Sequence, residues 1–157
     1  MKAISNPFIG QEDYDCFACA PHRSDGLRMQ FSLEGEEVVC LWDPDPRFEG
    51  YHGVLHGGIQ STLLDEIASW LIFVKLKTAG VTSKLCVEFL RPVHISRGKI
   101  KLTARLLEKR DRVARIQGCL FDARGHLCAR AEVEYVVYSP EAAKKKLDYP
   151  GYERFFS

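Results

Sequence analysis

The sequence lacks the segments that mark membrane-spanning, exported and nucleic-acid-binding proteins. No apolar run approaches the roughly 20 residues that a helix needs to cross a bilayer. The first residues, MKAISNPFIGQEDYD, do not have the basic start and apolar centre of a signal peptide. Lysine and arginine number 22 against 21 aspartates and glutamates, so no excess of positive charge favours nucleic acid. We therefore expect a cytoplasmic protein whose partners include neither a membrane nor a nucleic acid.

The sequence also lacks linkers, internal repeats and low-complexity segments. Its 157 residues are 46% hydrophobic, which suits one compact domain with a buried core. We expect a single domain over residues 1–157. The tail, residues 139–157, is polar and basic and then aromatic. We expect it to form a short helix that packs back on the body and has no chemical role.

The six cysteines lack the secretory context in which a disulfide framework forms, so we expect free thiols. Four of them lie in strand-like apolar runs, where cysteine acts as a small hydrophobe: Cys40, Cys86, Cys119 and Cys128. Cys16 and Cys19 instead form a C-F-A-C motif with His22 close behind, which suits a zinc or redox site or a packed turn. A structural zinc site usually has four ligands, and no second pair follows at ligand spacing. We expect no metal here.

A His-Gly-Gly triplet at residues 56–58 opens a stretch with helical periodicity. We expect a helix over about residues 57–78, with Lys75 and Lys77 near its negative pole and Gly80 as its stop. Its apolar residues recur at the spacing of one helix face: Ile59, Leu63, Leu64, Ile67, Leu71 and Val74.

Period-two alternation of apolar and polar residues predicts strands on both sides of this helix. The segments are residues 27–33, 37–42, 81–90, 99–106, 113–121 and 127–138. The last four follow one another through short turns, which predicts an antiparallel meander with one covered face. In the first of these four, we expect one face to carry Val81, Leu85, Val87 and Phe89. Only the single long helix is available to cover the apolar side of the sheet.

The helix carries polar groups suited to chemistry at two places. Glycines at its start let a ligand approach free N–H groups, where the helix dipole favours negative charge. Asp65 and Glu66 lie in an otherwise apolar and small-residue stretch, where burying a carboxylate is costly without a use or a partner. Helical phase turns Glu66 away from the direction of Asp65. This acidic pair therefore offers a possible base or nucleophile, although an ion pair between Asp65 and Arg91 or another cation across a subunit interface would also account for Asp65.

Several sequence segments resemble hotdog-fold acyl-CoA thioesterases of the phenylacetic-acid-degradation (PaaI-like) type. The most specific are H-G-G-I-Q-S-T-L-L-D-E and V-E-F-L-R-P-V. G-L-R-M-Q-F, F-E-G-Y-x-G-V-L-H and C-F-x-C fit the same group, so the resemblance covers about residues 16–138. It implies an α+β hotdog fold, in which an antiparallel sheet wraps around one long helix. It also implies hydrolysis of acyl-CoA or acyl-carrier thioesters with no metal or organic cofactor.

The resemblance assigns catalytic roles to three residues. Gly57 would supply the backbone N–H that polarises the thioester carbonyl, and Asp65 would act as general base or nucleophile. His56 would orient the loop or bond near the carbonyl oxygen, although it could equally be a helix cap or a buried structural histidine. A preorganised donor at an oxyanion contributes on the order of 3 kcal/mol.

The same resemblance suggests residues that bind substrate. Ser69, and either Thr82 or Ser83, match hydroxyls that orient water in relatives, although such hydroxyls often only satisfy backbone groups. Relatives often carry an amide side chain at the position of Gly50, a contact for which His52 could substitute. We add two neighbours of the assigned residues as substrate-binding candidates, Gly58 and Glu66. CoA phosphates could meet basic residues that solvated surface charge explains equally well: Arg91, Arg97 and Lys99.

The distance between the two ends of the site predicts a dimer. Nine residues of helix rise roughly 13 Å, so Asp65 cannot readily meet a carbonyl held at Gly57 of the same chain. An antiparallel helix from a second copy could bring its own Asp65 there. We therefore expect a homodimer with composite active sites, and the resemblance adds the pairing of dimers into tetramers.

Two other functions remain open from the sequence. One is a hotdog enoyl-CoA hydratase or dehydratase, which also uses a histidine and a carboxylate near a helix. The other is a non-catalytic protein that binds acyl-CoA. The acyl group itself is not specified, because Trp70, Phe73 and Phe89 suit either an acyl pocket or the core.

Overall fold

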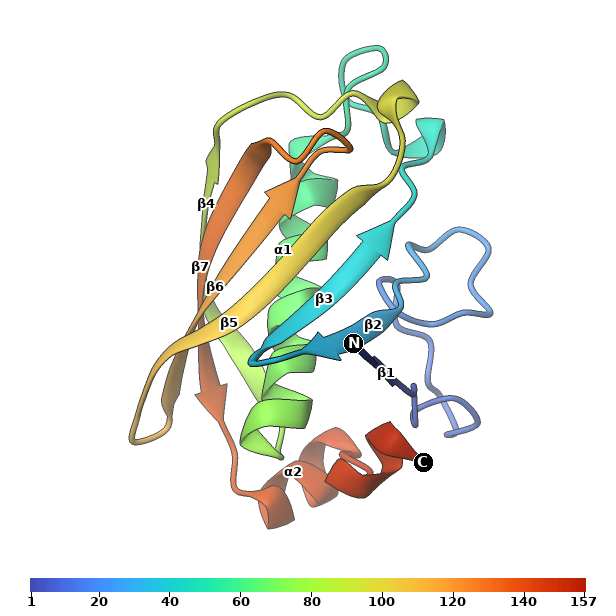
Figure 1. Cartoon of the computed structure of the whole chain (residues 1–157). Helices are drawn as coiled ribbons and strands as arrows, with labels where there is room; N and C mark the ends of the chain where they lie inside the picture. The colour runs from blue at the N-terminus through green and yellow to red at the C-terminus, as the bar shows by residue number, and fades with distance from the viewer.

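A computed structural model of the chain describes residues 1–157 (Figure 1). The strands are β1 (Lys2–Ile4), β2 (Phe31–Glu34), β3 (Glu37–Trp42), β4 (Gly80–Phe89), β5 (Ile100–Arg110), β6 (Val113–Phe121) and β7 (Leu127–Val137). The helices are α1 (Gly57–Leu71) and α2 (Pro140–Leu147), with shorter turns η1 (Pro46–Phe48), η2 (Ile72–Leu76), η3 (Ile95–Arg97) and η4 (Tyr152–Phe156). None of the helices is long and apolar enough to span a membrane.

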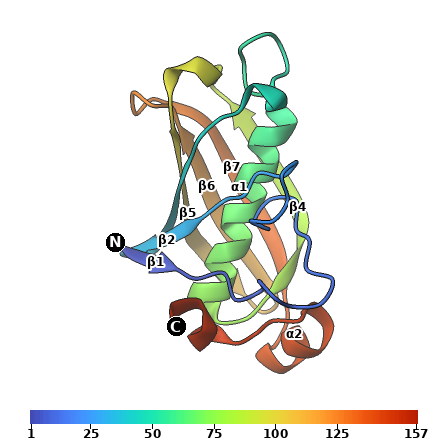
Figure 2. The same cartoon turned by 90° about the vertical axis from the view of Figure 1, so that its right-hand side faces the viewer.

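All seven strands form one antiparallel sheet in the order β1-β2-β3-β5-β6-β7-β4. The sheet curves around α1, which lies along its concave face (Figures 1 and 2). The helix buries its predicted apolar stripe there, including Leu63, Leu64 and Ile67, each with no exposed surface. The single helix therefore covers the sheet, as the sequence predicted.

A row of small residues lets α1 approach the sheet closely. Ala104 on β5, Gly118 on β6 and Ala131 on β7 are direct neighbours in register. A Cβ atom on Gly118 would lie 3.1 Å from Cδ2 of Leu64. Since that separation is tighter than nearly all real Cβ contacts, glycine at this position sets how closely the helix packs.

The predicted end of the helix is wrong in detail. The α-helical part ends at Leu71 and continues as the π-helical turn η2. The left-handed residue that ends it is Lys77, with a φ of 56°, and not Gly80. Gly80 begins β4, where a Cβ atom would lie 2.5 Å from the carbonyl oxygen of Val136. Glycine is therefore needed there for a close strand contact and not for a helix stop.

The first predicted strand is also shorter than expected. It begins at Phe31 because Arg28 has a φ of 51°, which interrupts extended backbone. The N–H groups of Leu27 and Met29 bond instead to the carbonyls of Phe17 and Ala18. The preceding residues 27–30 therefore belong to the N-terminal segment and not to the sheet. The sequence did not predict β1, which adds to the edge at β2.

The predicted four-strand meander is correct only for β5, β6 and β7. The strand β4 pairs with β7 at the far edge of the sheet and does not pair with β5. The connection from β4 to β5 is bound to the loop before α1, where Leu55 N–H donates to the Val93 carbonyl and Ile95 N–H to that of Gly53. This connection is too long to form a hairpin, so it crosses the end of the sheet.

A bulge in β4 changes which side chains face the helix. Thr82 pairs with Tyr135, and Lys84 pairs with Glu134, so Ser83 is the extra residue. The alternation therefore reverses at Ser83. Thr82 and Leu85 face the helix, whereas Val81 pairs with Val136 on the outer face. The prediction that Val81 shares a face with Leu85, Val87 and Phe89 is wrong for this reason.

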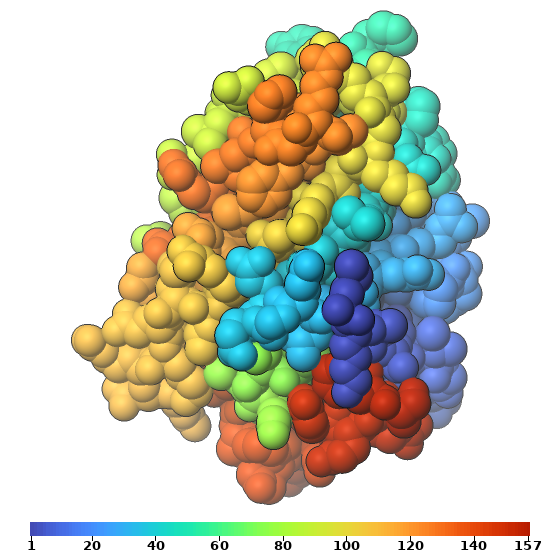
Figure 3. All heavy atoms as spheres, viewed as in Figure 1, coloured from blue at the N-terminus to red at the C-terminus, as the bar shows by residue number.

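The tail packs back on the body, as predicted. It forms α2 and η4, and Phe155 of η4 is fully buried beside Trp70 and Phe73. Figure 3 shows the tail against the N-terminal strands, where the Ser5 N–H donates to the carbonyl of Phe155.

We expect Leu64→Ala to lower the free energy of unfolding by about 2–5 kcal/mol, because it leaves a cavity over Gly118. Urea denaturation measures the change. The matched control is Leu41→Ala, since Leu41 is 59% exposed and its loss should cost less than about 0.5 kcal/mol. Equal losses in the two variants would contradict the role of Leu64 in helix packing.

Candidate active site

His56 caps the N-terminus of α1. Its Nδ1 accepts a hydrogen bond from the Gly58 N–H at 2.8 Å. Because Nδ1 is an acceptor, the ring proton is assigned to Nε2 in the neutral form. A Cβ atom on Gly58 would lie 3.1 Å from Nδ1, so glycine at this position makes room for the ring. His56 therefore has the capping role that the sequence left open. The Gly58 N–H is already bonded to its ring and is not free for a ligand.

The Gly57 N–H makes no hydrogen bond within the chain. It lies in the first turn of a 15-residue helix, where the backbone dipoles produce a positive pole. The ring of Phe89 lies beside it, 3.4 Å from where a Cβ atom of Gly57 would be. An unpaired N–H in this position can donate a hydrogen bond to a ligand oxygen that develops negative charge.

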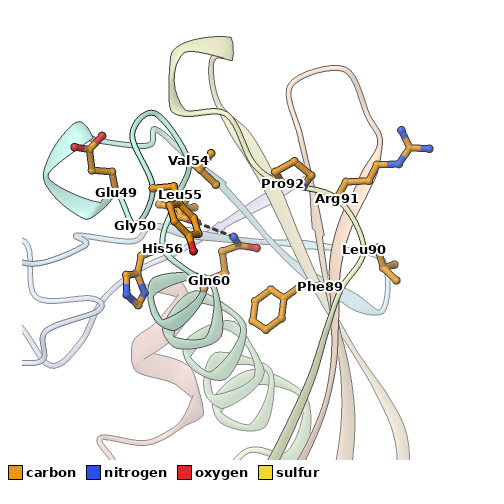
Figure 4. Close-up of a pocket in the computed structure, with 12 residues that line it drawn as sticks. Glu49, Gly50, Val54, Leu55, His56, Gln60, Phe89, Leu90, Arg91 and Pro92 are labelled. Atoms are coloured by element: carbon orange, nitrogen blue, oxygen red, sulfur yellow. Dashed lines mark hydrogen bonds between the residues drawn. The ribbon is translucent and has the colours of Figure 1, made fainter.

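A cavity of about 680 Å³ opens at this end of α1. Figure 4 shows it between the loop before the helix, the first turn of α1 and the end of β4. Its lining residues are Glu49, Gly50, Tyr51, Val54, Leu55, His56, Gly57, Gln60, Phe89, Leu90, Arg91 and Pro92. Gly57 and the Phe89 ring therefore share a cavity that could receive a ligand.

Gln60 is a polar residue of this cavity that the sequence analysis missed. Its side chain is buried, and Nε2 donates to the Leu55 carbonyl at 3.0 Å, the dashed line in Figure 4. Its Oε1 is buried without any hydrogen-bond partner. A buried acceptor without a donor is costly unless a ligand or water satisfies it. The available signal was an amide at a position on the buried stripe of the helix, one turn before Leu63 and Leu64.

Asp65 is held by two hydroxyls from the sheet. Its Oδ1 accepts from Thr82 Oγ1 at 2.8 Å and lies 2.8 Å from the hydroxyl of Tyr135, which is also 2.6 Å from the Asp65 backbone carbonyl. Burial raises the pKa of Tyr135 well above its usual value, so this hydroxyl stays protonated and donates. Asp65 forms no ion pair within the chain, and its pairing with Arg91 or another cation across a subunit interface stays a prediction. The second oxygen, Oδ2, has no hydrogen-bond partner.

The remaining predicted residues lie in different environments. The hydroxyl of Ser69 makes no hydrogen bond within the chain, and that of Ser83 donates to the Glu134 carbonyl at 3.1 Å. The His52 side chain is fully exposed beside Glu49 and does not line the cavity. Gly50 lines the cavity, and a Cβ atom added to it would lie 3.4 Å from Cδ2 of the His56 ring.

Glu66 points away from Asp65, as helical phase predicted. Its Oε1 accepts from Trp70 Nε1 at 3.0 Å and from the Cys16 thiol at 3.7 Å. Burial raises the pKa of Glu66 to about 7, and the nearby Cys16 adds to this effect. A hydrogen bond from Cys19 lowers the pKa of Cys16 to about 6, whereas the same bond and burial raise that of Cys19. Glu66 therefore belongs to a thiol cluster outside the cavity.

Of the three aromatic residues considered for an acyl pocket, only Phe89 lines the cavity. Trp70 stacks on Phe31 at 4.3 Å between ring centroids, and Phe73 stacks on Phe155 at 5.5 Å. Both belong to an aromatic cluster at the other end of α1, so they pack the core beneath the tail.

A sequence model of the thioesterase superfamily matches residues 52–129, from the loop before α1 into β7. The chain belongs to the thioesterase superfamily. The matched region contains the cavity-forming first turn of α1, Asp65 and Thr82.

The chain is also similar in sequence or structure to individual proteins. A protein of Saccharolobus solfataricus named "Putative esterase SSO1253" is 28% identical over 96 residues, which are 60% of this chain and 63% of that protein. The crystal structure of the thioesterase superfamily protein RHA08564 gives a TM-score of 0.69 at 24% identity, over 74% of this chain and 57% of that one. The chain therefore spans less than two thirds of the length of either protein.

A third comparison is the crystal structure of a hypothetical thioesterase protein with coenzyme A from Streptococcus pneumoniae TIGR4. It gives a TM-score of 0.65 at 17% identity, over 71% of this chain and 90% of that one. At these identities, the structural matches establish the fold. The fold of this superfamily member is the hotdog fold that the sequence predicted.

We expect Gly58→Ala to be less stable than Gly57→Ala by about 1 kcal/mol, the typical value of an N-terminal cap. Both variants gain the same helix propensity, but only the methyl group at position 58 displaces the His56 ring from its bond. Thermal or urea denaturation of the two variants measures the difference. Equal stabilities would show that His56 does not cap the helix in solution.

Proposed function

We propose that this superfamily member is an acyl-CoA thioesterase, which hydrolyses the thioester bond between an acyl group and CoA. The observation that carries the proposal is the unpaired Gly57 N–H at the start of α1, which opens into a cavity of about 680 Å³. A thioester carbonyl oxygen that accepts this N–H gains negative charge as its carbon is attacked. The helix pole and the fixed backbone donor stabilise that charge without rearrangement.

Asp65 supplies the other half of the reaction. Thr82 and Tyr135 hold Oδ1, so Oδ2 is the atom left to take a proton from water or to attack the carbonyl carbon. As a base, Oδ2 removes one water proton while the water oxygen bonds to the carbon. The C–S bond then breaks, and the proton passes to the departing CoA thiolate. As a nucleophile, Oδ2 bonds to the carbonyl carbon while the C–S bond breaks and CoA leaves as a thiolate. Water then hydrolyses the acyl anhydride to the free acid and the Asp65 carboxylate, and the proton released passes to the thiolate.

The two halves come from different subunits of a proposed homodimer. Asp65 lies eight positions after Gly57, which is about 12 Å along the helix. The strand β4 is an edge strand next to both groups, and its helix-facing apolar side chains are incompletely covered: Leu85 is 38% exposed and Phe89 is 54% exposed. A second copy packed along β4 and α1 would cover them and bring its own Asp65 to Gly57. Such dimers would pair further into a tetramer.

Charge and shape at the cavity favour CoA as the carrier. Arg91 lies exposed at the rim with no ion pair within the chain, where it could bind CoA phosphates (Figure 4). The structure from Streptococcus pneumoniae contains coenzyme A in the same fold. The apolar wall at Phe89 would contact the acyl group or the pantetheine arm. A panel of acyl-CoA and acyl-carrier-protein substrates, followed by thiol release, tests both the carrier and the acyl preference.

We expect Asp65→Asn to lower kcat by about 10²–10⁴-fold, because the amide cannot remove a proton or attack the carbonyl. The substitution keeps an oxygen that accepts from Thr82 and Tyr135, so the fold and the dimer should persist. Thiol release from acyl-CoA measures the rate, with Asp122→Asn in the β6–β7 turn as the matched control. Full turnover by Asp65→Asn would overturn the assignment, and a change in enoyl absorbance without thiol release would favour a hydratase.

We expect Gln60→Met to raise KM for acyl-CoA about fivefold with little change in kcat. A neutral hydrogen bond contributes about 1 kcal/mol, and Gln60 Oε1 is placed to accept one from a pantetheine amide. Steady-state kinetics measure both constants. Gln117→Met is the control, since it removes an amide that bonds Arg105 outside the cavity. A lower melting temperature with unchanged KM would mean that Gln60 only supports the Leu55 carbonyl.

A further inference from the structure

The N-terminal segment brings two thiols to the side of α1 that faces away from the sheet. Figure 2 shows this segment crossing the helix. Cys16, Cys19 and Glu66 meet there, and their potential ligand atoms all lie within 4.8 Å of one another. Glu66 follows Cys16 by 50 residues, so the third donor comes from folding and not from local spacing. His22 is not part of the group, because its ring bonds Asp15 at 3.1 Å.

The separations in this cluster are close to those around a tetrahedral zinc ion. Zinc–sulfur bonds of about 2.3 Å and zinc–oxygen bonds of about 2.1 Å place neighbouring ligand atoms about 3.5–3.8 Å apart. Cys16 Sγ and Glu66 Oε1 are already 3.7 Å apart. The others need to approach by no more than about 1 Å, which side-chain rotation can supply.

The charge of the cluster also fits a cation. No lysine, arginine or histidine forms an ion pair with Glu66, although its carboxylate lies among a thiol, an indole and the helix. A carboxylate away from water normally has a cationic or metal partner. The proposed hydrolysis does not use Glu66, because this side chain lies outside the cavity. The cluster therefore needs an explanation of its own.

We propose that Cys16, Cys19 and Glu66 form a binding site for a thiophilic divalent cation, of which zinc is the best match. Both thiols bind as thiolates, so each releases its proton to solvent, and the carboxylate supplies the third ligand. Water fills the fourth tetrahedral position on the side of Cys16, which is only partly buried. The ion carries two positive charges against three negative ligands.

Neighbouring groups would orient these ligands. The hydroxyl of Tyr14 lies 3.0 Å from Cys19 Sγ, and Trp70 Nε1 donates to the Glu66 carboxylate. Such outer contacts fix ligand geometry in metal sites. The turn that carries the thiols is itself held, since the Ala20 N–H donates to the Cys16 carbonyl and the Leu27 N–H to that of Phe17. A bound ion would tie this turn to α1 one residue after Asp65.

The test is a titration of the full chain with Co²⁺, a spectroscopic substitute for Zn²⁺, after chelation and under a non-metal-binding reductant. We expect one equivalent to bind with the charge-transfer band of cobalt–thiolate bonds, and Zn²⁺ to displace it. Zn²⁺ should also raise the melting temperature, because it binds only the folded site. This measurement does not depend on thioester hydrolysis.

Variants assign the ligands. Cys16→Ser, Cys19→Ser and Glu66→Gln should each weaken Co²⁺ and Zn²⁺ binding at least tenfold, and the glutamine can still accept the Trp70 bond, so that variant should fold. The control is Cys86→Ser, which removes the exposed thiol of β4 and should leave binding unchanged. Absence of the charge-transfer band, undiminished binding by folded Cys19→Ser or Glu66→Gln, or loss of binding in Cys86→Ser would each overturn the proposal.

Discussion

The close contact between α1 and the small-residue row of the sheet positions every other feature of the protein. Ala104, Gly118 and Ala131 are neighbours across three strands, and Leu64 packs over Gly118. Because side chains on a rigid helix have fixed relative directions, seating Leu64 sets both the height and the rotation of α1. The first turn then meets the loop that forms the cavity, and Asp65 points toward β4 and β7.

A single extra residue in β4 completes the environment of Asp65. Regular alternation along β4 would place Thr82 on the same face as Lys84, on the outside of the sheet. The bulge at Ser83 reverses the alternation, so Thr82 becomes the direct cross-strand neighbour of Tyr135 on the inner face. Two hydroxyls then reach one carboxylate oxygen and leave the other free. The bulge is a local irregularity with a specific consequence for the site.

The sequence predicted the positions of the helix and strands better than it predicted which strands pair. Periodicity is a local property, so it identified α1 and the main strands, but it carries no information on which strand pairs with β4. Periodicity does not predict the bulge either, and no residue type near Ser83 indicates one. Lys77 ends the helix in a left-handed conformation typical of glycine, which its residue type does not indicate. Motif spacing indicated His56, Gly57 and Asp65 as candidate site residues, whereas Gln60 lies within the apolar stripe and was missed.

Asp65 and Glu66 are adjacent in the sequence, but helix geometry directs their side chains into different surroundings. Successive residues on an α-helix point about 100° apart. Asp65 thus meets hydroxyls of the sheet, whereas Glu66 meets the thiol and indole groups on the opposite side. Exchanging these roles would require α1 to rotate about its axis, which the contact between Leu64 and Gly118 opposes. The packing that holds the helix therefore also decides which of the two acids meets the hydroxyls of the sheet and which meets the N-terminal segment.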